Sequence, residues 1–178
     1  MNSNMCRVRP WQVGDEVSLA QHANNHRIWQ NLLDSFPYPY TLEDAYKWIA
    51  SMSEQNPETH WAIQVADEAV GDIGIELTEG EFSQSGRIGF WLGEDFWGKG
   101  IMTDALSQTI CLAWSRFDQL LRLEASVFPR NSASIRVLEK CGFRPEQNNK
   151  LKLWKDSQLV DCFVYALSRQ KPPSFQLV

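Results

Sequence analysis

Apolar residues recur along the chain at two spacings, every second residue and every three to four residues, which predicts strands interleaved with helices. Strand-like runs lie at 6–9, 61–66, 70–77, 87–92, 123–128, 150–154 and 160–167. The second to fourth runs follow one another through polar connections, the later one at 78–86, so an antiparallel meander is the simplest arrangement. The last two runs predict a terminal hairpin.

Helical spacing is predicted at 15–22, 25–33, 100–117 and 131–141, and in a segment that follows Thr41 and runs through Met52. Thr41 and Asp44 approximate a capping box at the start of that segment. The last helix ends in Gly142 with Phe143 behind it, which is typical of a left-handed helix cap with a hydrophobic contact. Helices and strands together indicate an α/β (α+β) domain.

The segment 34–40 separates two of the predicted helices and contains Pro37 and Pro39, which forbid a regular helix. Its aromatic residues are Phe36, Tyr38 and Tyr40. A stiff aromatic loop is therefore expected. The simplest role for its rings is a hydrophobic plug over the sheet.

Composition fits one ordinary soluble domain, because 43% of the 178 residues are hydrophobic and 22% are charged. We expect this domain to span 1–170, with 171–178 as a tail outside the fold. No apolar run approaches the roughly 18 to 20 residues that cross a bilayer. Residues 1–10 lack the apolar core of a signal peptide, so a cytoplasmic location without membrane attachment is expected.

The formal net charge is −5, and the lysines and arginines form no cluster. Nucleic-acid binding is not expected, because it needs a basic face to neutralise phosphates, whereas a cationic acceptor is compatible with this charge. The cysteines lack a Cys-x-x-Cys pair and an accompanying histidine, so buried free thiols are expected rather than a zinc site or disulfides. They are Cys6, Cys111, Cys141 and Cys162. The histidines, interpreted as structural or surface groups, are His22, His26 and His60.

The strand at 87–92 leads through the glycine-containing turn Gly93-Glu94-Asp95-Phe96-Trp97-Gly98-Lys99-Gly100 into an amphipathic helix. Glycines let a backbone approach a phosphate, and the free N–H groups of a first helical turn point at the anion. Donors from 98 to 103 would suffice for a pyrophosphate. A steric need for glycine in the turn is the alternative. A dinucleotide-binding turn is disfavoured because its third glycine is missing, and a Walker A loop is excluded because Gly-Lys-Ser/Thr is absent.

A second motif follows the strand at 123–128 and reads Asn131-x-x-Ser134, then Leu138-Glu139-Lys140-x-Gly142-Phe143. With Trp97-Gly98-Lys99-Gly100 and Arg122-Leu123-Glu124-Ala125 upstream, this order resembles the GNAT superfamily of acetyltransferases. The branch that it resembles is the ribosomal-protein N-terminal acetyltransferase-like group, which also includes polyamine acetyltransferases. The resemblance spans nearly the whole chain and is loosest in the N-terminal third.

The resemblance implies a GNAT-type central mixed, mostly antiparallel sheet flanked by helices and splayed between its fourth and fifth strands, 87–92 and 123–128. Acetyl-CoA would occupy the gap as co-substrate, without a metal. Its pantetheine would pair with backbone like a short strand, and its pyrophosphate would lie on the glycine turn. The implied cofactor-binding residues are Trp91, Leu92, Gly93, Gly98, Lys99, Gly100, Ile101, Met102, Thr103, Asn131 and Ser134. The alternative for Asn131 is a helix N-cap alone, and for Ser134 a first-turn serine.

The implied activity is transfer of the acetyl group to a primary amine by direct attack, with a backbone N–H at the end of the fourth strand stabilising the oxyanion. Ser134 is the candidate acid, because Leu138 stands where many relatives have tyrosine. Arg87 stands where close relatives often have glutamate, which leaves Glu76 and Glu124 as candidate bases. The alternative for both carboxylates is a solvated position on a sheet face.

The acceptor is expected to be a protein N-terminus, a polyamine or another small amine. Relatives build one wall of the acceptor pocket from the loop at 34–40, so the candidate substrate-binding residues are Phe36, Tyr38, Tyr40 and, on the terminal hairpin, Trp154. Relatives usually have Asp-Gly at the turn of that hairpin, so Asp156-Ser157 predicts a looser turn. The protein is expected to be a monomer or a homodimer.

Two other functions stay open from the sequence. The departures at Arg87 and Leu138 permit a non-catalytic acyl-CoA-binding or sensing module that kept the pyrophosphate loop and lost its acid and base. A dinucleotide-binding oxidoreductase is the third possibility, and it depends on the glycine turn alone.

Overall fold

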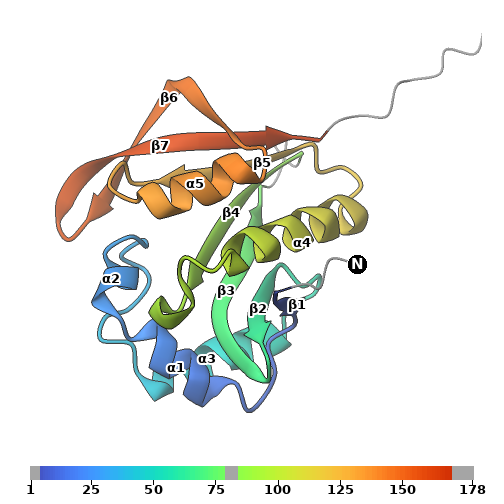
Figure 1. Ribbon diagram of the computed structural model, residues 1–178, viewed down its shortest axis with the longest axis vertical. Coiled ribbons are helices and arrows are strands. Elements are labelled where there is room, and N and C mark those ends of the chain that lie inside the picture. The colour runs from blue at the N-terminus through green and yellow to red at the C-terminus, as the bar shows by residue number, and fades with distance from the viewer. Residues whose placement is uncertain (1–4, 79–83, 170–178) are drawn as a thin grey trace, which may run out of the picture.

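The computed structural model describes residues 5–78 and 84–169 (Figure 1). The expected tail at 171–178 and the middle of the connection at 78–86 lie outside the described residues. The elements in chain order are β1 (Arg7–Arg9), α1 (Glu16–Ala23), α2 (His26–Trp29), α3 (Leu42–Ser53), β2 (His60–Val65), β3 (Glu68–Leu77), β4 (Ser85–Leu92), the 3-10 turn η2 (Glu94–Phe96), α4 (Ile101–Arg116), β5 (Arg122–Val127), α5 (Ser132–Lys140), β6 (Arg144–Lys155) and β7 (Gln158–Ser168).

All described strands belong to one sheet with the order β1-β2-β3-β4-β5-β7-β6. Strands β1 to β4 are antiparallel neighbours, so the predicted meander is confirmed. Strands β5, β7 and β6 are also antiparallel to one another. Among the described strands only β4 and β5 pair in parallel, and α4 makes the crossover between them. The predicted mixed, mostly antiparallel sheet is therefore confirmed.

Strands β4 and β5 are paired only where they begin. Three residue pairs join them, from Ser85↔Arg122 to Arg87↔Glu124, while β4 continues to Leu92 and β5 to Val127. Beyond these pairs, the described hydrogen-bonded neighbour of β4 is β3 and that of β5 is β7. The two strands diverge toward their carboxyl ends, as predicted for the fourth and fifth strands.

Helices cover both faces of the sheet (Figure 1). The larger core lies between the sheet and α4 and buries mostly aliphatic side chains, among them Ile73, Leu106 and Leu123. The smaller core lies under α1 and α3 and includes Ala45 and Trp91. Alternate residues of β3 and β4 therefore face two different environments, and the face under α1 and α3 carries the polar side chains described below.

Two predicted helix ends are confirmed. Thr41 Oγ1 accepts the N–H of Asp44 at 3.2 Å, and the Asp44 carboxylate accepts the N–H of Thr41 at 2.8 Å. These bonds from Thr41 lower the pKa of Asp44. Gly142 has a φ of 90°, and the buried Phe143 donates its N–H to Leu138 O at 3.1 Å. A capping box and a left-handed glycine cap thus set these boundaries.

The predicted helix at 25–33 is too long, because α2 ends at Trp29. Asn25 caps its start by accepting a backbone N–H. Beyond it, the N–H groups of Asn31 and Leu32 donate to carbonyls three residues back, which is tighter than an α-helix. The proline-containing loop that follows offers no helical continuation, so the apolar spacing continues through a series of turns instead. Strand β6 also begins earlier than the predicted run at 150–154.

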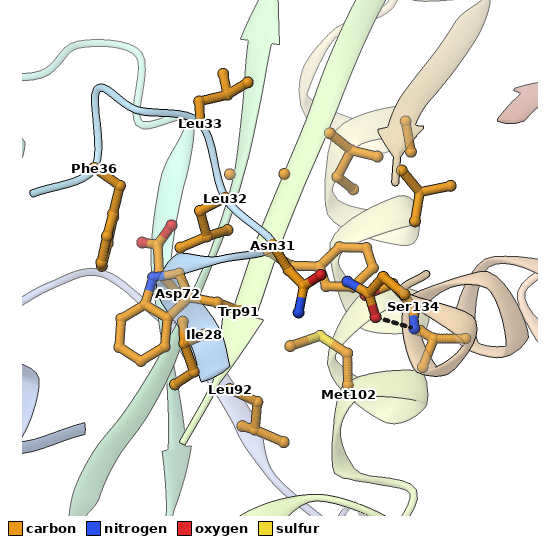
Figure 2. Close-up of a pocket in the computed structure, with 18 of the residues that line it drawn as sticks. Ile28, Asn31, Leu32, Leu33, Phe36, Asp72, Trp91, Leu92, Met102 and Ser134 are labelled. Carbon is orange, nitrogen blue, oxygen red and sulfur yellow. Dashed lines mark hydrogen bonds between the residues drawn. The ribbon is translucent and has the colours of Figure 1, made fainter. Parts of the chain in front are cut away.

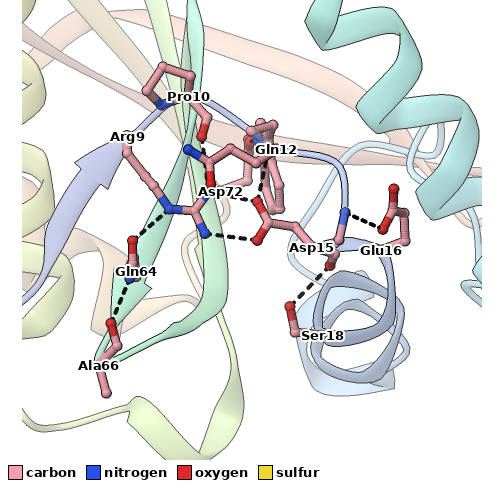
Figure 3. Close-up of polar contacts among 11 residues, drawn as sticks. Arg9, Pro10, Gln12, Asp15, Glu16, Ser18, Gln64, Ala66 and Asp72 are labelled. Atoms are coloured by element: carbon pink, nitrogen blue, oxygen red, sulfur yellow. Dashed lines mark hydrogen bonds and ion pairs between the residues drawn. The ribbon is translucent and has the colours of Figure 1, made fainter.

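A buried ion pair fastens β1 to the start of α1 (Figure 3). The Arg9 guanidinium bonds both carboxylate oxygens of Asp15, at 2.6 and 2.8 Å, and Gln64 Oε1 of β2 at 2.6 Å. Only 7% of the Arg9 side chain and 12% of the Asp15 side chain are exposed. A guanidinium at this depth is tolerated only while its carboxylate partner is present.

Replacing Asp15 with alanine is expected to lower the free energy of unfolding by about 3 to 5 kcal/mol, because Arg9 would become an uncompensated buried charge. Denaturant titration followed by tryptophan fluorescence measures the change. Asp161→Ala is the matched control, because it breaks an exposed pair with Lys152 and should cost at most about 1 kcal/mol. Equal losses in the two variants would contradict the importance given to burial.

Candidate active site

A cavity of about 1310 Å³ lies along the gap between β4 and β5. Its walls come from the carboxyl-terminal parts of those strands, the first turns of α4 and α5, and the segment from α2 through the loop at 34–40. Figure 2 shows Ile28, Leu32 and Phe36 on one side of this cavity and Met102 and Ser134 on the other. The two motifs found in the sequence therefore meet across one open space.

The glycine turn brings the start of α4 to the cavity. Gly98 and Gly100 have φ values of 72° and 83°, a region that other residues rarely adopt. Gly100 is the N-cap of α4 and offers no side-chain cap, so the amides of its first turn lack an intrahelical partner. The cavity-lining residues of this segment are Gly98, Gly100, Ile101, Met102 and Thr103. Lys99 is not among them, and its ammonium lies over the Phe96 ring, 5.6 Å from the centroid.

The strand register decides which amides of β4 face the gap. Gly93 donates its N–H to Val70 O of β3 at 2.7 Å. Because backbone groups in an antiparallel strand alternate between the two edges, Trp91 also bonds toward β3, and the N–H groups of Phe90 and Leu92 point into the gap. Of the three residues expected to pair with pantetheine, Leu92 alone presents its amide on that edge. Phe90 was not anticipated from the sequence.

Helix α5 presents Asn131 and Ser134 to the cavity. Asn131 Oδ1 accepts the N–H of Ser134 at 3.2 Å and so caps the helix (Figure 2). No hydrogen bond is formed by the Ser134 hydroxyl within the described part of the chain. Leu138 is only 1% exposed and belongs to the larger core. The capping role of Asn131 thus coexists with its position on the cavity wall.

The two candidate bases differ in position. Glu76 lines the cavity and stands opposite Arg87 in the β3–β4 register, with 3.3 Å between carboxylate and guanidinium. Their side chains are 64% and 65% exposed. Glu124 is not part of the cavity lining, and it bonds the Arg122 guanidinium at 2.7 Å. Of the two candidate bases, Glu76 alone therefore lines the cavity.

Two of the predicted aromatic residues form part of the wall. Phe36 and Tyr40 stack with their centroids 5.0 Å apart, and Phe36 meets the Trp91 ring edge-on at 6.0 Å. All three line the cavity. Burial raises the pKa of Tyr40, and nearby carboxylates add to the effect, so its hydroxyl stays protonated. The rings supply an apolar surface with one neutral hydroxyl.

The other two predicted aromatic residues lie outside the cavity lining. Tyr38 is 44% exposed and packs on His26 and Trp29. Trp154 is 66% exposed on β6. Within the loop, Tyr38 therefore lies apart from Phe36 and Tyr40, which its aromatic composition could not show.

The terminal hairpin turns tightly, contrary to the looser turn expected at Asp156-Ser157. Lys155 pairs with Gln158, and the two residues between them have positive φ values of 50° and 60°. This is the geometry of two-residue turns that match the twist of a hairpin. Asp34 accepts the Asp156 N–H at 3.0 Å and lies 2.9 Å from the Lys155 ammonium. The bond from Lys155 lowers the pKa of Asp34 and ties the loop at 34–40 to the hairpin.

His60 lines the cavity beside Asp72, which the sequence interpretation of the histidines did not anticipate. His60 Nδ1 lies 3.4 Å from Asp72 Oδ2, and Trp11 Nε1 donates to Asp72 Oδ1 at 2.9 Å. Asp72 is 7% exposed. By contrast, the buried His22 bonds Glu68 at 2.8 Å and is structural, as interpreted. Strand pairing creates the His60–Asp72 contact, and no local motif marks it.

Within the described residues, no group of three or more His, Cys, Asp or Glu side chains is placed to hold a metal ion. All four cysteines are free; Cys6 and Cys162 are buried as expected, but Cys111 is exposed. Burial, with the neighbouring Asp104 carboxylate, raises the pKa of the Cys6 thiol to about 12. None of the helices in the described ranges has the length and apolar character needed to cross a membrane.

Comparisons with known proteins agree with the motifs. Residues 6–144 match the model of the acetyltransferase (GNAT) domain family. The probable N-acetyltransferase YjcK of Bacillus subtilis (strain 168) is 34% identical over 167 residues, which cover 86% of this chain and 91% of that protein. The uncharacterized N-acetyltransferase p20 of Bacillus licheniformis is 27% identical over 167 residues, which cover 92% and 93%.

Solved structures share the fold. RimJ of Mycobacterium smegmatis, in complex with CoA-disulfide, has a TM-score of 0.78 and 25% identity, with 92% of this chain and 85% of that chain covered. The spermidine N-acetyltransferase of Vibrio cholerae, in complex with CoA and spermine, has a TM-score of 0.75 and 15% identity, with 93% and 96% covered. The family model spans most of the chain and includes the glycine turn and α5. The chain therefore belongs to the GNAT family of acetyltransferases and is an acetyl-CoA-dependent N-acyltransferase.

Proposed function

We propose that this enzyme moves the acetyl group of acetyl-CoA onto a primary amine by direct attack, without an acyl-enzyme intermediate. The observation that carries the proposal is the unlike character of the two sides of one cavity. One side holds a helix start with unpaired amides, which suits a diphosphate. The other holds aromatic rings and the carboxylates Asp72 and Glu76, which suit a cationic amine.

On the donor side, the diphosphate is assigned to the amides that begin α4, where Gly98 and Gly100 allow close approach. The pantetheine arm is assigned to the free edge of β4, with the N–H groups of Phe90 and Leu92 as donors. Trp97 Nε1 already donates to Leu92 O at 2.6 Å, so this carbonyl is engaged while the amide is not. The Leu92 N–H is therefore our candidate for the oxyanion donor. Complexes of structural neighbours with CoA-disulfide and with acetyl-CoA support acetyl-CoA as the acetyl donor.

On the acceptor side, the chemistry favours an ammonium but does not select one molecule. Phe36, Tyr40 and Trp91 offer ring surfaces, and the carboxylates of Asp72 and Glu76 offer negative charge. The volume of the cavity exceeds that needed for a single amine. A protein N-terminus, a polyamine and other small amines all fit this description, and structural neighbours include a ribosomal L7/L12 alpha-N-protein acetyltransferase and a spermidine N-acetyltransferase.

Ser134 is assigned to the departing sulfur. Ser134 lies on the first turn of α5, whose start is capped by Asn131, on the side of the cavity where α4 begins. Because a serine hydroxyl is a weak acid, we expect it to hydrogen-bond the thiolate or to relay a proton from water. The buried Leu138 offers no competing group.

Thr103→Glu is expected to weaken CoA binding by roughly tenfold or more, because a carboxylate in the first turn of α4 repels the diphosphate. The helix should remain stable, since acidic side chains suit this position. Isothermal titration with CoA measures the dissociation constant. Thr103→Gln has the same length without the charge and should bind within about threefold of wild type. Equal weakening in both variants would remove the diphosphate from this turn.

Ser134→Ala is expected to lower kcat roughly 10- to 100-fold while CoA affinity changes little, because the hydroxyl acts on the leaving thiolate. Thiol release with a colorimetric reagent gives kcat, and titration gives the affinity. Ser115→Ala, at an exposed serine outside the cavity lining, should keep both values. Parallel losses of kcat and affinity at Ser134 would reduce the residue to a packing role.

A further inference from the structure

Three residues in one row across β2, β3 and β4 shape the acceptor side of the cavity. His60 pairs with Gly74, and Gly74 pairs with Gly89. Directly opposed residues of antiparallel strands point to the same face, so the His60 side chain shares its face with two positions that carry none. All three residues line the cavity.

The two glycines have different surroundings. A Cβ on Gly74 would lie 2.1 Å from His60 Nδ1, so the imidazole lies directly over this residue. A Cβ on Gly89 would meet nothing within 4 Å. The space next to the imidazole, over β4 and toward the gap with β5, is therefore open to a ligand.

A buried carboxylate orients the imidazole. Asp72 Oδ2 lies 3.4 Å from His60 Nδ1, and Trp11 Nε1 donates to the opposite oxygen at 2.9 Å (Asp72 is labelled in Figure 3). The Trp48 ring meets the imidazole edge-on, with centroids 5.2 Å apart. With the proton on Nδ1 shared with the carboxylate, Nε2 carries the free lone pair.

The Nε2 atom is available to a substrate. Within the described part of the chain, the hydrogen bonds of the His60 ring involve Nδ1 alone. The side chain is 21% exposed, and the residue is part of the cavity wall. A proton acceptor thus faces the same open space that Gly89 leaves free.

The surrounding charges make the imidazole a stronger base. Burial alone lowers the pKa of His60, but the hydrogen bond and charge of Asp72, with the charge of Glu76, outweigh burial and raise it. The other charged side chains that line this part of the cavity are Arg87 from β4, which pairs with Glu76, and Asp44 and Lys47 from α3.

We propose that His60 is the general base of the acetyl transfer, that Asp72 positions it, and that the acceptor amine lies over Gly89. This inference rests on the proposed function, since it requires an amine acceptor. It also explains why Glu76 need not serve as the base: that carboxylate is engaged by Arg87 and largely exposed to solvent.

The bound ammonium gives one proton to His60 Nε2 and becomes a neutral amine. Its nitrogen attacks the thioester carbonyl, forming the C–N bond, and the C–S bond breaks with its electron pair on sulfur. The second proton lost by nitrogen neutralises the thiolate, directly or through the Ser134 hydroxyl. His60 then releases its proton to solvent through the open cavity.

The test compares kcat over pH 5.5 to 9.5 for wild type, His60→Gln and Asp72→Asn, with acetyl-CoA and saturating spermine, n-butylamine or a short peptide with a free N-terminus. In wild type, kcat should rise as pH passes upward through the pKa of His60, because only the neutral imidazole accepts a proton. His60→Gln should lose this limb and about 100-fold or more in kcat, with the KM for acetyl-CoA unchanged within about twofold. Asp72→Asn should shift the limb to lower pH, because the carboxylate raises the pKa.

The controls separate the possible failures. His26→Gln removes an exposed imidazole outside the cavity wall and should behave as wild type. Wild type that acetylates none of the amines would overturn the proposed function. Active wild type with an unaltered pH limb in His60→Gln would overturn the assignment of His60 alone, as would loss of that limb in Glu76→Gln but not in His60→Gln.

The position of the amine has its own test. Gly89→Val fills open space without a clash at its Cβ, so the fold should be kept, as circular dichroism and the melting temperature can verify. The KM for the amine should rise about tenfold or more, while the KM for acetyl-CoA stays within about threefold. An unchanged KM for the amine in the folded variant would show that the acceptor lies elsewhere.

Discussion

The early end of the β4–β5 pairing is the constraint on which the rest of the molecule depends. Three residue pairs hold the strands together at their amino ends, and beyond Arg87 each strand bonds only its outer neighbour among the described residues. A row of backbone donors on β4 is thereby left for a ligand in the interior of the sheet. Because the paired strands are parallel, both diverge at the same end of the sheet, where the starts of α4 and α5 lie.

The cavity formed by this divergence has two electrostatic characters. Unpaired amides and the positive end of a helix dipole stand at the α4 side, and carboxylates with aromatic rings stand at the side under α1 and α3. In our proposal, a negatively charged donor and a positively charged acceptor are thus drawn to opposite sides of the same thioester. The polarity follows from which helices cover which face of the sheet.

Two positions at which the sequence departs from the resembled family have charged or polar neighbours in space. Arg87 stands where the resemblance predicts a frequent glutamate, and Glu76 lies directly opposite it, so a carboxylate is still present at this point of the sheet. Leu138 replaces a frequent tyrosine and is buried in the core, while the Ser134 hydroxyl one turn earlier lacks a partner in the described structure. In our proposal, His60 on β2 takes the proton from the amine instead.

Local sequence determined much of this protein. Period-2 and period-3.6 patterns located nearly all strands and helices, the caps at Thr41 and Gly142 formed as predicted, and the glycines at 98 and 100 marked the start of α4. These features depend on residues within a few positions of one another, so their physical causes are visible in the sequence. The resemblance to the family predicted the divergence of the fourth and fifth strands, which depends on the order of the strands in the sheet.

Only the tertiary structure decided which side chains share the cavity. Glu76 lines the cavity and Glu124 does not, because strand register decides where each carboxylate lies. Phe36 and Tyr40 line it, whereas Tyr38 and Trp154 do not, because the path of an irregular loop and the course of β6 decide where these rings lie. The tertiary structure turned the amides of Phe90 and Leu92, rather than that of Gly93, toward the gap. It also brought His60 to one oxygen of Asp72 through the pairing of β2 with β3, and Trp11 to the other oxygen through the packing of the chain before α1. Contacts between residues distant in the chain are set by the free energy of the whole fold, and no local pattern encodes them.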